Sequence, residues 1–239
     1  MGETAYWDPD TDTRTKLILA GEALFGSRGI DAVPLHEVVT AAGQRNVSAL
    51  SYHIGGREAL LMAILDYRRS SVDARRFALL QEYIAAGIVM DEAAIAAGII
   101  LPLAELMMKD PNGGNYLRLL TQVFVTDRPR ASYAVAGRFD QGWRLCRRLY
   151  RAWFPGVSHR ALIERFETCS HGAMYAMADW ERDKVAPRNF PRSGFMTFIS
   201  DLIALTASAL ASHGRSDPRF KPFATIQPAS VDAEELALQ

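Results

Sequence analysis

Hydrogen-bonding side chains crowd into residues 45–53, a short stretch that lies between the glycines at positions 43 and 55. Arginine fits the acceptors of guanine in the major groove, asparagine fits adenine, and serine fits either base. Serine and tyrosine hydroxyls also suit the phosphates of a duplex. These residue types, so close together, predict contact with double-stranded DNA. The candidates are Arg45, Asn46, Ser48, Ala49, Ser51, Tyr52 and His53.

Arg57 extends this group, because it opens the next predicted helix, where its charge and the free backbone N–H groups suit a phosphate. Lys and Arg number 27 and Asp and Glu also number 27, so any positive surface must be local. Other interpretations stay open at this stage. Arg45 and Asn46 are also typical turn residues, and Tyr52 and His53 would also serve as packing residues of a small helical unit.

Three short helices are expected to position these side chains. Asp12 or Thr13 suits the cap of a first helix, whose apolar residues recur at helical spacing until Gly29. Pro34 suits the start of a second helix, which Gly43 ends, and residues 47–54 form a third. A tight turn between the second and third of three short helices predicts a helix-turn-helix.

The segment from Thr13 to Leu61 combines helical apolar spacing with glycine breaks and a polar third helix. The residues that carry this pattern are Leu17, Ala20, Leu24, Phe25, Gly29, Val38, Ala42, Gly43, Leu50, Ser51, Tyr52, His53, Ile54, Gly55, Gly56, Arg57, Glu58 and Leu60. In these residues the segment resembles the DNA-binding domain of the TetR family. The resemblance implies a transcriptional regulator, by the family's habit a repressor, that binds a palindromic operator as a homodimer and is released by a small molecule.

Three departures from the family pattern fall in the same segment. Ser51 stands where the family has its first tyrosine, so Tyr52 is the residue expected to contact phosphate. The turn 44–47 is one residue longer than usual, which leaves the register of the recognition helix open. Pro34 replaces a hydroxyl residue that caps the second helix, so that phosphate contact is lost or moves to His36.

The remainder of the chain predicts an all-α fold, because helical spacing recurs and alternation typical of strands is scarce. Pro102 is expected to kink or split its helix. The predicted division is an extension over 1–12, a helix-turn-helix domain over 13–57, a ligand-binding and dimerisation domain over 58–213 and a loosely attached tail over 214–239. The further helices are expected at 57–83, 91–109, 115–126, 130–154, 158–184 and 193–212.

The resemblance implies that the second domain binds a small-molecule effector between its helices and that its last two helices form a four-helix bundle with a second copy. The aromatic content of 10% and the 8 methionines permit an effector that is largely apolar. Each candidate residue for either role is also explained by packing in the chain's own core. The candidates for the effector site are Met107, Tyr116, Phe124, Phe139, Trp143, His171 and Tyr175. The candidates for the dimer interface are Cys169, Gly172, Ala176, Phe198, Leu202 and Leu205.

Four arginines recur at helical spacing between residues 144 and 151, namely Arg144, Arg147, Arg148 and Arg151. A solvated basic face explains them. The alternative is an anion site for an acidic effector such as an acyl-CoA or another carboxylate.

Other classes of protein find little support in the sequence. None of the motifs of metalloproteases, phosphate-binding loops, serine hydrolases or CxxC redox sites is present, so we expect neither an enzyme, a metal site nor a cofactor. Cys146 and Cys169 are read as buried free thiols of a cytoplasmic protein. No signal peptide and no membrane-spanning run is found. A ligand-binding helical adaptor without DNA binding is the alternative function.

Overall fold

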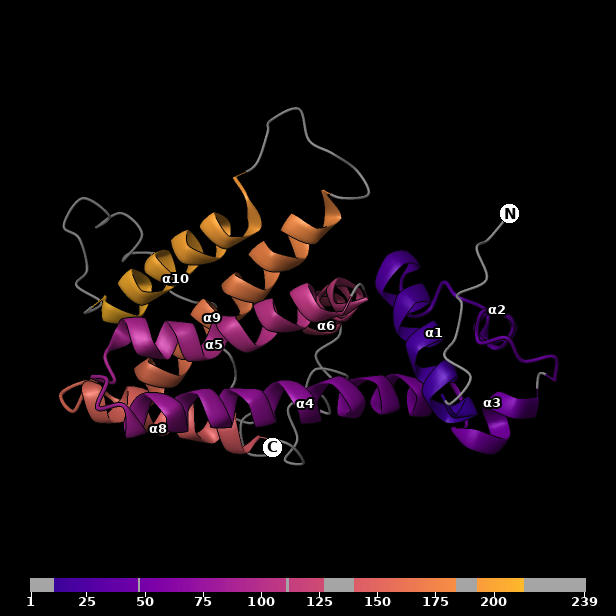
Figure 1. The fold of residues 1–239 in the computed structure, drawn as a ribbon, viewed down its shortest axis with the longest axis horizontal. Helices are drawn as coiled ribbons and strands as arrows, with labels where there is room; N and C mark the ends of the chain where they lie inside the picture. Colours follow the sequence, from indigo (N-terminus) through magenta and orange to yellow (C-terminus); the bar gives the residue numbers. More distant parts are fainter. Residues whose placement is uncertain (1–10, 47, 111, 127–139, 184–192, 213–239) are drawn as a thin grey trace, which may run out of the picture.

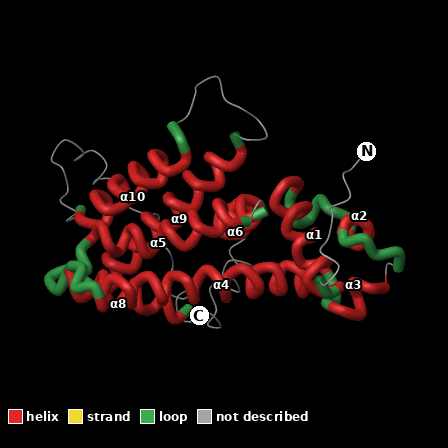
Figure 2. The backbone as a smooth tube through the Cα atoms, in the orientation of Figure 1, coloured by secondary structure: helices red, strands yellow, loops and turns green. Residues whose placement is uncertain are grey.

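The computed structural model describes residues 11–46, 48–110, 112–126, 140–183 and 193–212. Every regular element in these ranges is an α-helix, which confirms the predicted all-α class (Figure 2). The helices are α1 (Thr13–Arg28), α2 (Leu35–Ala41), α3 (Ser48–His53), α4 (Arg57–Ala85), α5 (Glu92–Lys109), α6 (Gly113–Thr126), α8 (Gln141–Trp153), α9 (His159–Arg182) and α10 (Phe195–Ala211).

Helices α1, α2 and α3 form one end of the elongated molecule, and α4 runs from them along most of its length (Figure 1). Asp12 caps α1 by accepting a hydrogen bond from the backbone N–H of Thr15 at 3.0 Å, as the sequence predicts. Gly29 ends α1 with a φ of 100°, which a side chain would make strained. Leu17, Phe25 and other apolar residues are buried between the three helices.

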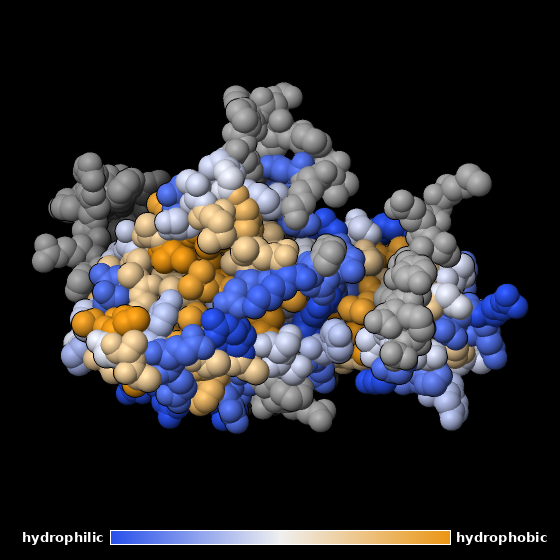
Figure 3. Space-filling view, viewed as in Figure 1, coloured by the Kyte–Doolittle hydropathy of each residue, from blue (hydrophilic) through white to orange (hydrophobic). Residues whose placement is uncertain are grey.

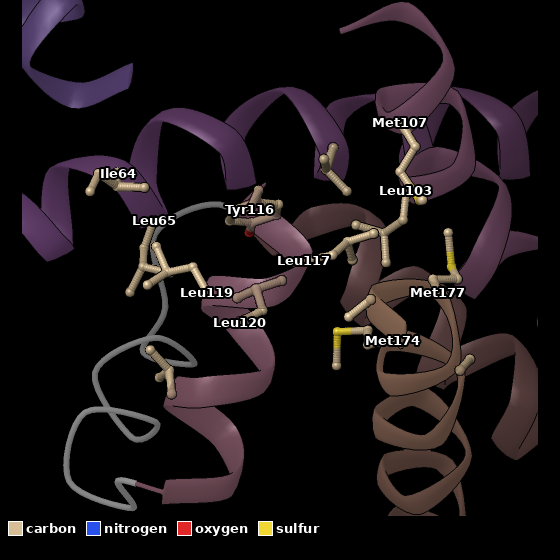
Figure 4. Packing of buried hydrophobic residues seen from close by; sticks show 14 of the residues in the cluster. Ile64, Leu65, Leu103, Met107, Tyr116, Leu117, Leu119, Leu120, Met174 and Met177 are labelled. Atoms are coloured by element: carbon tan, nitrogen blue, oxygen red, sulfur yellow. The ribbon is translucent and has the colours of Figure 1, made fainter. Parts of the chain in front are cut away.

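Helices α5, α6, α9 and α10 lie largely on one side of α4 in Figure 1, whereas α8 overlaps α4 in this view. Helix α10 packs mainly against α5, α9 packs against α6, and α8 lies along α4. Their shared interior is made of leucine, isoleucine and methionine side chains, part of which Figure 4 shows. Both termini of the chain, and the expected extension and tail, lie largely outside the described residues, as do the predicted helical residues 130–139.

Pro102 lies inside α5 without splitting it, so the splitting alternative is wrong. A proline cannot donate to the carbonyl four residues earlier, which here belongs to Gly98. The buried guanidinium of Arg76 donates to that carbonyl instead, with 3.0 Å between Nε and the oxygen. The helix therefore continues because a side chain of α4 satisfies the carbonyl that the proline leaves free.

Asp73 joins α4 to the start of α8. Its carboxylate accepts hydrogen bonds from the backbone N–H groups of Gly142 and Trp143, both at 2.9 Å, and pairs with Arg76 at 3.3 Å. The first N–H groups of a helix have no partner within the helix, and a negative charge there is favourable. Asp73 thus caps α8 from another helix, a role that Asp140, the residue before α8, does not fill with a side-chain hydrogen bond.

The two cysteines are free thiols in different surroundings. Cys146 is buried, and this burial raises the pKa of its thiol to about 12. Cys169 is half-buried, and burial raises its pKa as well. Because the thiolate is the reactive form, we expect iodoacetamide at about pH 8 to label Cys146 at least tenfold more slowly than Cys169 in the folded protein.

Peptide mass spectrometry after timed labelling measures both rates. In urea the two cysteines should react at similar rates, which serves as the control. Equal labelling of both thiols in the folded protein would contradict the burial of Cys146.

Candidate functional site

Helices α2 and α3 and the turn between them hold the candidate DNA-binding residues. Gly43 has a φ of 70° and lets the chain turn after α2. The backbone N–H of Gln44 then donates to the carbonyl of Val39 at 3.0 Å. Val38, Val39 and Leu50 are buried, so apolar packing fixes α3 against the other two helices. The result is the helix-turn-helix arrangement that the sequence predicts.

The predicted DNA-contacting side chains lie on the outside of this unit. Tyr52 is 86% exposed, which leaves its ring no part in the core and removes the packing alternative for this residue. Ala49 is half-buried. In Figure 3 hydrophilic residues dominate the surface at this end of the molecule. The exposed candidates are His36, Arg45, Asn46, Ser48, Ser51, Tyr52 and His53.

Two of these residues also hold local structure. The side-chain oxygen of Asn46 accepts a hydrogen bond from the backbone N–H of Ser48 at 2.9 Å, the turn chemistry that the sequence left as an alternative. The carbonyl of His53 accepts a hydrogen bond from Arg14 at 2.9 Å, and its ring lies edge-on to Tyr52. Arg45 is exposed and makes no hydrogen bond or ion pair within the described part of the chain, so its guanidinium is available to a ligand.

Arg57 is engaged inside the protein. Its Nη1 donates to the carbonyl oxygens of Ile30 and Val33, the latter at 2.7 Å, and its guanidinium lies over the ring of Phe25. These contacts fasten the start of α4 to the connection between α1 and α2. A phosphate contact through the Arg57 side chain has to compete with them, whereas the backbone N–H groups at the start of α4 do not face that competition.

The second half of the chain matches a known family. Residues 97–209 match the family model of the tetracyclin repressor-like C-terminal domain. This match confirms the predicted resemblance to the TetR family, whose members regulate transcription in response to a ligand.

Two solved structures are similar to this chain at low sequence identity. A mutant of HlyIIR with one segment substituted by alanine has a TM-score of 0.50 and 14% identity, and the match covers 87% of this chain and 100% of that one. A structure described as the molecular basis for control of antibiotic production by a bacterial hormone has a TM-score of 0.47 and 16% identity, with coverage of 82% and 96%. No curated protein sequence matches this chain.

A buried ion network connects the helix-turn-helix to the rest of the chain. Arg68 of α4 pairs with Glu22 of α1 through two hydrogen bonds of 2.6 and 2.8 Å, and with Asp110 after α5 at 2.5 Å. Burial raises the pKa of Glu22 above its ordinary value, although Arg68 opposes that shift. Burial alone would lower the pKa of Arg68, but its two acidic partners outweigh this and raise the pKa.

Helix α6 also contacts α1 directly. The side-chain amide of Gln122 donates to the carbonyl oxygens of Phe25 and Gly26, both at 3.2 Å, at the end of α1. A Cβ atom on Gly26 would lie 2.5 Å from the backbone oxygen of Asn115, so only glycine allows this approach. Helix α1 is therefore held by α4 at Glu22 and by α6 at its last turn.

Replacing Gly26 by alanine is expected to lower the free energy of unfolding by about 1–3 kcal/mol, because the added methyl meets backbone and forces α1 away from α6. Urea unfolding followed by circular dichroism measures the change. Gly156→Ala is the matched control, since its Cβ would meet nothing within 4 Å and should leave stability within about 0.5 kcal/mol. Equal stability of the two variants would rule out the close approach.

The structure does not gather the predicted effector residues into one place. Met107 and Tyr116 are buried in the core, where Figure 4 shows them among other apolar side chains. Trp143 packs against Phe166 and over Arg76. Tyr175 is exposed, and Phe139 lies outside the described residues.

Phe124 and His171 are the two effector candidates that meet, with ring centroids 4.7 Å apart. Burial lowers the pKa of His171, which favours its neutral form. This contact joins α6 to α9. The two side chains come from different helices, and the sequence analysis predicts both of them for the effector site.

The predicted dimer residues divide between the core and the surface. Leu202 is buried within the chain, and Phe198 is half-buried and stacked near Trp180. Cys169 and Ala176 are also half-buried. Gly172 is exposed, and Leu205 is 68% exposed on α10. One part of the α10 stripe therefore packs on the chain's own helices, and another part faces outward.

Sequence reasoning missed the buried ionic residues that join the helices. A usable signal existed for Glu22, because it shares an apolar stripe with Ile18 and Phe25, and for Arg68, which follows Ile64 and Leu65 at helical spacing. Nothing local identified their partners. Within the described ranges, no group of three or more His, Cys, Asp or Glu residues is placed to hold a metal ion, and no helix is long and apolar enough to cross a membrane.

Proposed function

We propose that this chain is a TetR-family repressor that binds a palindromic operator as a homodimer through α3 and releases it when a small, largely apolar effector binds. The observation that carries the proposal is the exposed polar face of the helix-turn-helix, with Tyr52 86% exposed above the buried Leu50. An exposed tyrosine in this position can offer its hydroxyl group to a phosphate of the duplex. Because its proposed partner is DNA, we propose that the protein acts in the cytoplasm.

The contacts follow from what each side chain offers. We infer that Arg45 reads a base edge and that Ser51 and Tyr52 bind phosphates through their hydroxyl groups. His36 is exposed near the start of α2, and we propose it as a further phosphate contact. The remaining contacts are assigned to the face of α3 and the start of α4, at Asn46, Ser48, Ala49, His53 and Arg57.

Dimerisation would place two recognition helices about 34–36 Å apart, one turn of the duplex. We propose residues 13–57 as the DNA-binding domain and 58–213 as the ligand-binding and dimerisation domain. In the dimer, α9 and α10 of each copy would together form a four-helix bundle. The exposed Gly172 and Leu205 support this face, because an apolar side chain and a small residue there allow close approach of a second copy.

Release of DNA is proposed to pass through α4 and α6. Arg68 of α4 and Gln122 of α6 hold α1, so a shift of either helix moves the DNA-binding unit. An effector that binds better to the shifted state lowers the affinity for DNA, and DNA lowers the affinity for the effector by the same factor.

The test is binding of the full chain to DNA selected from a random pool, followed by fluorescence anisotropy. Arg45→Ala is expected to weaken binding by about 1–3 kcal/mol, roughly fivefold to more than a hundredfold, through the loss of a base contact. Tyr52→Phe, which removes only the hydroxyl, should weaken all sequences alike. Arg160→Ala is the control, because Arg160 is an exposed arginine on α9, far along the chain from α3.

Salt dependence separates the two candidate functions. Affinity for the selected DNA should fall steeply as salt rises, because phosphate contacts release counterions. The lack of a side-chain cap at Pro34 keeps the adaptor alternative open, since the family's phosphate contact at this position is missing. An adaptor would select no sequence and show no specific binding at any salt concentration.

A further inference from the structure

The outer face of α8 carries a row of four arginines. They are Arg144, Arg147, Arg148 and Arg151. The spacing i, i+3, i+4, i+7 places them on one side of the helix. The other side carries Cys146 and Tyr150, which are buried against the rest of the domain. The row thus lies where α8 meets solvent.

The arginines line one wall of a pocket of about 690 Å³ between α8, α4 and α9. The lining also includes Phe77 of α4, Tyr150 of α8, and Leu162 and Ile163 of α9. Pockets for small molecules usually have volumes of roughly 300–1,000 Å³. The pocket therefore has the size of a ligand site, and its lining is cationic in part and apolar in part.

The positive charge of this wall is mostly unneutralised. Arg144 donates to Asp140 at 2.8 Å, but within the described part of the chain no carboxylate pairs with Arg147, Arg148 or Arg151. The nearby Glu164 of α9 is held by Arg160 at 2.8 Å. Like charges three and four residues apart on a helix destabilise it, so a bound anion would relieve repulsion as well as gain hydrogen bonds.

We propose that this pocket binds an anionic amphiphile, a molecule with a carboxylate or phosphate head and an apolar body. The head contacts Arg148 and Arg151, because guanidinium groups form paired hydrogen bonds with both kinds of anion. The body lies against Phe77, Leu162 and Ile163. The site differs from the predicted effector residues, none of which lines the pocket. Binding here does not require the chain to bind DNA, so the inference goes beyond the proposed function.

Isothermal titration of the full chain with four probes tests the proposed chemistry. Decanoate and decyl phosphate carry both features, decanol carries only the apolar body, and inorganic phosphate carries only the charge. At least one of the two amphiphiles should bind about tenfold or more tightly than either single-feature probe, and the tighter one identifies the head group. Equal binding of decanol, or no binding of either amphiphile, would overturn the proposal.

A double variant places the site on α8. Arg148→Gln with Arg151→Gln should weaken amphiphile binding by at least about tenfold. Both side chains are exposed, so the fold should survive, which the urea midpoint checks. The matched control is Lys109→Gln with Arg182→Gln, which removes two exposed charges outside the pocket and should change binding less than twofold. Unchanged affinity in the α8 variant would refute the site.

A measurement without any variant gives a second criterion. Raising the salt concentration should weaken the binding of the amphiphile to the unaltered chain. The reason is that salt screens the attraction between the anionic head and the exposed arginines. Binding that is insensitive to salt would place the ligand in the apolar core and contradict the assignment to α8.

Discussion

Arg68→Met is expected to lower the free energy of unfolding by about 3–5 kcal/mol near pH 8. The substitution leaves the carboxylate of Glu22, whose side chain is 0% exposed, without its two hydrogen bonds from Arg68. Removing one partner of a buried ion pair is strongly destabilising, because the other charge stays buried and uncompensated. Urea unfolding followed by circular dichroism measures the loss.

The loss should depend on pH in a defined direction. Burial raises the pKa of Glu22 from its ordinary value of 4.5, and without Arg68 the pKa rises further. A carboxyl group with a raised pKa contributes stability that is present below its unfolded pKa and lost as the pH rises through its folded pKa. The variant should therefore be closer in stability to the unaltered chain near pH 5 than near pH 8.

Glu22→Gln combined with Arg68→Met is the matched control. Because glutamine cannot ionise, this pair buries no charge and should recover more than half of the lost stability. If Arg68→Met alone unfolds within about 1 kcal/mol of the unaltered chain, the network does not hold α1 to α4 as described.

The second large effect is expected at Asp73, whose side chain caps α8 from α4. Asp73→Ala leaves the N–H groups of Gly142 and Trp143 and the buried guanidinium of Arg76 without this acceptor. We expect a loss of about 3–5 kcal/mol in the free energy of unfolding. Hydrogen exchange should show the largest loss of protection at the start of α8.

Asp73→Asn grades this effect, because it keeps an acceptor oxygen but loses the charge, and should be destabilised by about half as much. Glu164→Ala removes an exposed carboxylate from a surface pair and should change stability by no more than about 1 kcal/mol. A loss at Asp73 as small as that at Glu164 would show that the trans cap contributes little.

Local sequence patterns account for the elements of the DNA-binding unit. The Asp12 cap, the glycine at position 29 and the apolar spacing between them lie within one helix and its ends. The same holds for Gly43, which ends α2, and for the short helix that follows. Capping and periodicity act over a few residues, so they are visible in the chain before it folds.

The roles of single side chains were less accessible. Tyr52 and Asn46 lie six residues apart, yet the ring of Tyr52 faces solvent whereas the side chain of Asn46 accepts a hydrogen bond from a neighbouring backbone N–H. Arg57 was expected at a phosphate, and the structure shows it donating to carbonyls of the connection between α1 and α2. A side chain with several donors satisfies whichever acceptor the fold brings near, which its type alone does not reveal.

The helix-turn-helix with its cluster of polar residues was thus determined by the sequence itself, and so was the arginine row of α8. Only the tertiary structure decided what surrounds them. It paired Glu22 with Arg68, set Asp73 at the start of α8 and placed Phe77 and Leu162 around the same pocket as the arginines. Each of these contacts joins separate helices, so it depends on how helices pack rather than on any pattern within one of them.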